Sequence, residues 1–155
     1  MEERLFAGYH KIKVTPPLGL PVPGYFAKRT SDGIVRCTAF ALGEKKALVF
    51  SLDAISLNAQ AFDIISDMIT EATGVEKDGM YITCVHSHTA FRVQKPGEEW
   101  TDTNVFLRWL FKQFVTCARL ALEDLKSLWK SGETAAKKLP NLLKIWKNLN
   151  ESALL

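Results

Sequence analysis

Two histidines with one residue between them, His86 and His88, are the side chains in this sequence best suited to chemistry. They follow the apolar, β-prone run 80–85. Because alternate residues of an extended chain point to the same side, both imidazoles are expected to face one site. His-x-His spacing also occurs at ordinary polar strand ends. The pair therefore predicts a metal-binding or catalytic site chiefly through its place at the end of a buried strand, where open α/β sheets carry their sites.

The segments before this pair predict a strand, a helix and a second strand that form a parallel βαβ unit. Residues 46–52 are almost wholly apolar, as in a strand covered on both faces. Asn58 is a suitable N-cap for the following helix, and Gly74 is a natural end for it. Both strands of such a unit end at the same edge of the sheet, which brings Asp53 to the edge that carries His86. Asp53 then either holds an imidazole N–H in the catalytic site or caps the next helix.

The remaining segments complete the expected architecture. They are an opening strand at 8–14, a loop rich in proline and glycine at 18–33, a hairpin strand at 34–42, a long helix at 103–126, and a last amphipathic helix from Pro140. The expected fold class is α/β, with a mixed sheet that contains a parallel βαβ unit, is flanked by helices and is followed by a C-terminal amphipathic helix. We expect residues 1–126 to form the α/β domain and residues 127–155 to form a basic helical tail.

Composition limits the classes of protein to which the chain can belong. Its 155 residues, 47% of them hydrophobic, suffice for one packed domain. The net charge of +3 and the lack of a recognisable motif give no indication of a nucleic-acid partner. The three cysteines lie in apolar segments without CxxC spacing, so buried, reduced thiols are expected. No signal peptide or membrane-spanning run is evident, which predicts a soluble cytoplasmic chain.

Three parts of the sequence, in order and at compatible spacing, resemble the start of the catalytic domain of the neutral, non-lysosomal ceramidase family. They are residues 8–25 with the run Val-Thr-Pro-Pro-Leu-Gly, the Ser-Leu-Asp at 51–53, and the Val-His-Ser-His-Thr at 85–89. The resemblance covers residues 6–126. It implies a zinc-dependent hydrolase of the amide bond of ceramide or a related N-acyl lipid.

The resemblance also implies roles for individual residues. His86 corresponds to the family's first signature histidine, a zinc ligand. His88 corresponds to the second, which lies beside the metal in the catalytic site and contacts substrate. Tyr25 and Arg29 would line the substrate pocket or pack as ordinary loop residues, and Asp53 is a weaker catalytic candidate. A neutral imidazole is a good Zn²⁺ ligand, and an open zinc site lowers the pKa of bound water to about 7 and polarises a carbonyl.

Two departures from the family pattern limit what the resemblance implies. After the histidines the family has Ser-Gly-Pro, whereas this chain has Thr89, Ala90 and Phe91, which cannot fix the same turn. The family's further ligands, a histidine, a glutamate and a tyrosine, come from regions beyond residue 155. We therefore expect a truncated amide hydrolase, active or inactive. The alternative is a non-catalytic module of this fold that binds a ligand or partner, and open sheet edges would favour self-association.

The last thirty residues differ in composition and do not match the family. Residues 126–155 hold six lysines and two glutamates. One hypothesis is that a truncated or frame-shifted gene reads through into an unrelated peptide. A second is that 137–150 lies on an anionic membrane surface. The third, which apolar stripes at helical spacing favour, is a solvated helix whose leucine face covers core left open by truncation.

Overall fold

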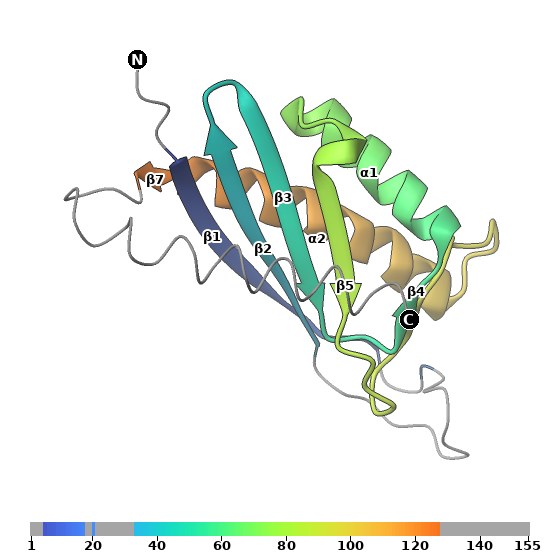
Figure 1. Ribbon diagram of the computed structural model, residues 1–155. Coiled ribbons are helices and arrows are strands. Elements are labelled where there is room, and N and C mark those ends of the chain that lie inside the picture. Colours follow the sequence, from blue (N-terminus) through green and yellow to red (C-terminus); the bar gives the residue numbers. More distant parts are fainter. Residues whose placement is uncertain (1–4, 18–19, 21–32, 128–155) are drawn as a thin grey trace, which may run out of the picture.

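The structure is a computed structural model that describes residues 5–17, 20 and 33–127. The elements in chain order are β1 (Leu5–Val14), β2 (Gly33–Leu42), β3 (Lys45–Leu52), β4 (Ser56–Leu57), α1 (Ala59–Thr73), the 3₁₀ turn η1 (Lys77–Gly79), β5 (Met80–Cys84), β6 (Arg92–Val93), α2 (Asp102–Glu123) and β7 (Lys126–Ser127). Figure 1 labels all of them except η1 and β6. The expected helix from Pro140, like most of the expected tail 127–155, lies outside the described residues.

The main sheet is mixed, with the strand order β5-β3-β2-β1-β7. The first three strands along the chain form an antiparallel meander, β7 adds two residues beside β1, and β5 pairs with β3 in parallel after α1. Both long helices lie behind the sheet in the view of Figure 1. The prediction of a mixed α/β fold with helices against the sheet is confirmed.

The inner face of the sheet, the one that faces α1 and α2, holds the core. Its strand residues alternate with outward-facing ones, as the two-residue period of a strand requires. Phe50 of β3 and Phe114 of α2 are both fully buried, and their ring centroids are 5.4 Å apart. The expectation that β3 is covered on both faces is not met among the described residues. Leu48, Phe50 and Leu52 are buried, while the alternate residues are only half-buried.

Local signals in the sequence fix both ends of α1. The Asn58 side chain accepts a hydrogen bond from the backbone N–H of Ala61 at 2.9 Å, which satisfies one free donor of the first turn. Gly74 ends the helix with a φ of 70°, a left-handed conformation that costs glycine little. The predicted N-cap and helix end are both confirmed.

The end of α2 differs from the prediction that the helix continues to residue 126. The helix ends at Glu123, and the chain turns so that β7 can pair with β1. The Asp124 carboxylate accepts a hydrogen bond from the Tyr9 backbone N–H at 3.2 Å. Gly8 makes this close approach possible, because a Cβ there would lie 2.1 Å from the Ala121 carbonyl oxygen. Long-range pairing with the first strand therefore stops the helix early.

A second, smaller sheet was not predicted. It consists of β4 and β6, two parallel strands of two residues each, which pair Ser56 with Arg92 and Leu57 with Val93. A further hydrogen bond joins the Ile55 N–H to the carbonyl oxygen of Phe91 at 3.0 Å. This small sheet ties the segment after β3 to the segment after β5.

The cysteines are unpaired, as expected. Cys37 and Cys117 are buried between β2 and α2, and Cys84 is half-buried at the end of β5. Burial raises the pKa of the Cys84 thiol to about 11 and that of Cys117 to about 12. These thiols are therefore protonated near neutral pH and serve as packing groups. Neither described helix is both long and apolar enough to cross a bilayer.

Candidate functional site

The candidate site lies at the edge of the sheet where β3 and β5 end. These two strands are parallel and in register, with Leu52 beside Cys84. The backbone N–H of Val85 continues the pairing by donating to the Leu52 carbonyl oxygen at 3.1 Å. Asp53 and His86 come directly after these positions, so both belong to the same edge. Parallel α/β sheets place ligand sites at this carboxyl edge.

The two imidazoles lie beside each other, but not because the chain is extended. His86 has a φ of 58° and is the only non-glycine residue in the described part of the chain with a positive φ. The sequence-based expectation of an extended His86-Ser87-His88 segment is therefore wrong. The left-handed residue turns the chain, and the imidazole rings of His86 and His88 meet edge to face with centroids 5.3 Å apart.

This conformation at His86 is unfavourable and must be held by its surroundings. A left-handed backbone costs a non-glycine residue about 1–2 kcal/mol, although histidine adopts it more readily than most. Residues held in sparsely populated backbone regions cluster at functional sites. Both His86 and His88 are exposed, so the two imidazole rings are open to solvent at the edge of the sheet.

The segment after the histidines forms a turn that is anchored at both ends. The Ala90 N–H donates to the Ser87 carbonyl oxygen at 3.2 Å, and the Ser87 hydroxyl lies 2.9 Å from that of Thr89. Phe91 is 1% exposed and packs edge to face on Phe106 of α2, with centroids 5.1 Å apart. Two buried residues, Ala90 and Phe91, thus stand where the family pattern has Gly-Pro.

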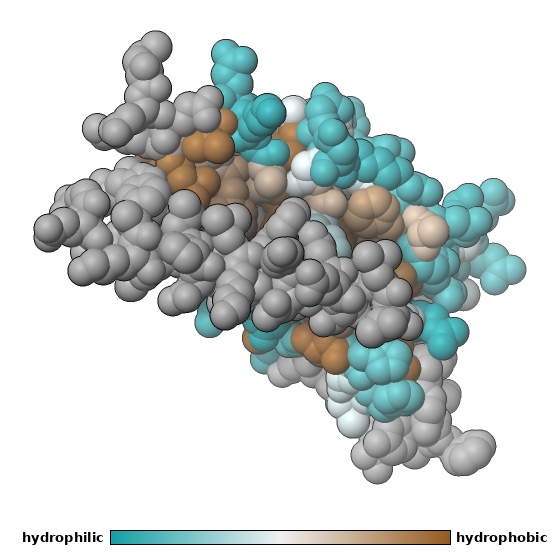
Figure 2. Space-filling view, in the orientation of Figure 1, coloured by the Kyte–Doolittle hydropathy of each residue, from teal (hydrophilic) through white to brown (hydrophobic). Residues whose placement is uncertain are grey.

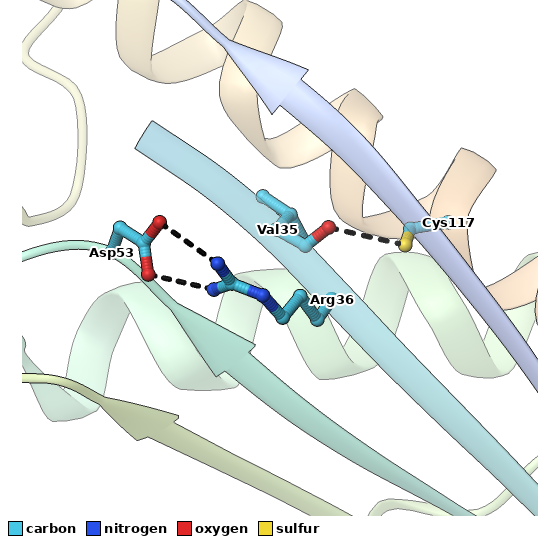
Figure 3. Close-up of polar contacts among 4 residues, drawn as sticks. All are labelled: Val35, Arg36, Asp53 and Cys117. Carbon is cyan, nitrogen blue, oxygen red and sulfur yellow. Dashed lines mark hydrogen bonds and ion pairs between the residues drawn. The ribbon is translucent and has the colours of Figure 1, made fainter. Parts of the chain in front are cut away.

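Asp53 is bound to a residue that the sequence analysis missed. Its two carboxylate oxygens accept hydrogen bonds from the two terminal nitrogens of Arg36 at 2.7 and 3.2 Å (Figure 3). About a quarter of the Asp53 side chain and a third of the Arg36 side chain are exposed. The hydrogen bond that Arg36 donates to Asp53 raises the pKa of Arg36, so the guanidinium stays charged. The capping interpretation of Asp53 is wrong, because Asn58 caps α1.

The register of the hairpin between β2 and β3 would have predicted the contact between Arg36 and Asp53. Gly43 has a φ of 59° at the tight turn between β2 and β3, and Leu42 pairs with Lys45. This register sets Arg36 opposite Ser51. Asp53 lies two residues further along the same face, which makes it the diagonal neighbour of Arg36. Figure 3 shows the consequence, with Arg36 and Asp53 on one side of the sheet and the contact between Val35 and Cys117 on the other.

In the part of the chain that the structure describes, two imidazoles are the metal-ligating groups found in contact at this edge. Within the described ranges, no three side chains of histidine, cysteine, aspartate or glutamate lie close enough together to hold a metal ion. His10, the third histidine of the chain, is on β1, and β2 and β3 separate that strand from β5. Tyr25 and Arg29, the expected pocket residues, lie outside the described residues.

Comparisons with known proteins bear on the fold. No protein-family model and no curated protein sequence matches the chain. A crystal structure of the neutral ceramidase from Pseudomonas aeruginosa matches with a TM-score of 0.65 and 10% sequence identity, over 82% of this chain and 23% of the ceramidase chain.

A second solved structure, a ceramidase complexed with C2, matches with a TM-score of 0.63 and 12% identity, over 81% of this chain and 22% of the other. The chain thus spans less than a quarter of the length of either structure. Structural similarity at sequence identities this low establishes the fold and leaves the activity open. The chain has a ceramidase-like fold.

Proposed function

We propose that the chain provides the first part of a zinc-dependent hydrolase of the amide bond of ceramide or a related N-acyl lipid, with His86 as a zinc ligand. The observation that carries this proposal is the pair of adjacent imidazoles at the carboxyl edge of β3 and β5. The ceramidase-like fold supports it, because the matched proteins are ceramidases.

The chemistry of the two imidazoles fits part of a zinc site. Zinc binds imidazole nitrogen readily and needs about four ligands, of which catalytic sites draw three from protein. At this edge the described residues offer two imidazoles, so His86 would hold the metal together with groups from outside the described residues. When bound, zinc supplies a Lewis acid for the amide carbonyl and a water of lowered pKa.

The other residues of the edge receive supporting roles. His88 stands against the ring of His86 and faces solvent, which suits a side chain that contacts substrate beside the metal. Asp53 is held by two hydrogen bonds from Arg36. We assign Arg36 and Asp53 the role of positioning the end of β3 at this edge. Tyr25 and Arg29 remain proposed pocket residues.

Zinc content and amide hydrolysis test the proposal together. The wild-type protein, loaded with zinc and dialysed, should retain about one zinc per chain if the ligand set is complete, and less if it is not. His86→Ala should lower zinc retention and hydrolysis of a fluorescent N-acyl sphingosine. His10→Ala is the matched control, because it removes an imidazole from β1, which β2 and β3 separate from β5. Equal zinc retention in all three proteins would contradict the assignment of His86.

The same measurements separate an enzyme from a binding module. If wild type binds zinc through His86 but hydrolyses no N-acyl lipid, the metal site is supported and the hydrolase proposal fails. If wild type neither retains zinc nor hydrolyses substrate, the non-catalytic alternative is the better description. Equilibrium dialysis with a short-chain ceramide then tests that alternative directly.

A further inference from the structure

The outer face of the sheet, the one that points away from α1 and α2, carries apolar side chains that no described element covers. They include Tyr9, Ile34, Phe40, Leu42, Val49 and Tyr81, which come from all four long strands. Three of them are well exposed, Tyr9 at 47%, Leu42 at 40% and Tyr81 at 58%. Figure 2 looks onto this side and shows apolar residues in brown and tan among the polar ones.

An apolar sheet face of this kind needs a partner, because contiguous exposed apolar surface on a soluble domain marks an interaction site. The inner face shows what such a partner looks like in this protein, since α1 and α2 bury their apolar stripes on it. A sheet face that is open to water is normally polar, so the apolar residues of this outer face indicate a further covering layer. An amphipathic helix therefore fits the outer face by the same chemistry.

The part of the chain that the structure describes ends at the edge of this face, so the residues that follow are within reach of it. β7 pairs with Phe6 and Ala7 of β1, so residue 128 continues from one lateral edge of the sheet. From β7 to β5 the sheet has four strand spacings, a width of about 19 Å. The twelve residues 128–139 span at most about 40 Å, enough to reach any point of the face.

The sequence beyond residue 139 has the pattern that the outer face requires. Pro140 is suited to the first turn of a helix. Leu142, Leu143, Trp146 and Leu149 follow at helical spacing, and Lys144 and Lys147 lie on the other sides of that helix. Ten residues of helix are about 15 Å long, which fits within the sheet.

We propose that residues 140–149 form an amphipathic helix that packs its leucine and tryptophan stripe on the outer face of the sheet. The occupant is a segment of the same chain, because a segment that starts at the edge of the face has a higher effective concentration there than a second copy in solution. The packing closes the side of the sheet that α1 and α2 leave open, and it is independent of any metal at the histidine edge.

Hydroxyl-radical footprinting of the full chain tests this proposal through Tyr81. The variant Leu143→Glu/Trp146→Glu places two charges in the stripe, and Asn141→Glu/Asn148→Glu places the same two charges on the polar side of the same helix. Trp100, which is 85% exposed, serves as the internal reference. We expect the oxidation of Tyr81 relative to Trp100 to rise several-fold in the stripe variant and to stay at the wild-type level in the control.

Cross-linking gives a second readout that does not depend on protection. A lysine-reactive reagent should join Lys144 or Lys147 to Lys11, an exposed residue of the outer face of β1, within single chains. The proposal is overturned if Tyr81 is oxidised equally in all three proteins. It is also overturned if protection depends on protein concentration, which indicates a second copy, or appears only with phosphatidylserine vesicles, which indicates a membrane surface.

Discussion

The core between sheet and helices and the histidine edge are built in opposite ways. The core consists of fully buried apolar side chains such as Phe50 and Phe114, which belong to one cluster. The edge consists of exposed imidazoles on a turn, with an unfavourable φ at His86 and a partly exposed ion pair between Arg36 and Asp53. The core stabilises the fold, while the left-handed residue at the edge lowers that stability slightly. Changes in the core should therefore abolish both regions, while changes at the edge should leave the fold intact.

The largest effect is expected from the core. Phe114→Ala removes a ring that is fully buried against Phe50, and such a cavity costs about 3–5 kcal/mol of the free energy of unfolding. Val105→Ala, on the exposed side of the same helix, should change it by less than about 0.5 kcal/mol. Urea denaturation followed by circular dichroism measures both. Equal effects of the two variants would break the distinction between core and surface.

A smaller effect on the free energy of unfolding is expected at His86, where the smaller residue glycine should be the more stabilising one. Glycine adopts a φ of 58° without the steric cost borne by other residues, so His86→Gly should be more stable than His86→Ala by about 1 kcal/mol. The same pair of substitutions at His88 should show no such preference for glycine. Urea midpoints of the four variants give the result. If alanine is the better residue at position 86, the left-handed conformation is not retained in solution.

The smallest effect is expected from the ion pair. Arg36 and Asp53 are partly exposed, and pairs of this kind contribute about 0.2–1 kcal/mol. A double-mutant cycle of Arg36→Gln and Asp53→Asn should give a coupling energy in that range. The coupling should weaken as salt is added, because the pair is open to solvent. A coupling well above the range would mean that the edge is a structural part of the core.

The sequence predicted those parts of the fold that rest on local signals. The caps of α1 at Asn58 and Gly74 follow from residue type alone. The β4–β6 pair and β7 are contacts of two residues each between distant segments, and no local pattern specifies them. The early end of α2 depends on the same long-range contact with β1.

The sequence indicated His86, His88 and Asp53 at the candidate site, but neither Arg36 nor the geometry. The end of an apolar strand indicated His86, and the hairpin register contains the contact between Arg36 and Asp53. The turn that follows His86 leads into Phe91, which is buried against Phe106 of α2, and such long-range packing leaves no signal in the local sequence. Sequence alone therefore identified the pair of imidazoles and gave the wrong reason for their proximity.

The most direct test of the account is a zinc titration followed by NMR of the imidazole resonances. The chain has three histidines, so each can be assigned by a single substitution. We predict that zinc shifts the resonances of His86, moves those of His88 beside it, and leaves those of His10 on β1 unchanged. If His86 stays unmoved while zinc binds, or if all three histidines shift alike, the histidine edge is not a metal site and the proposed function fails.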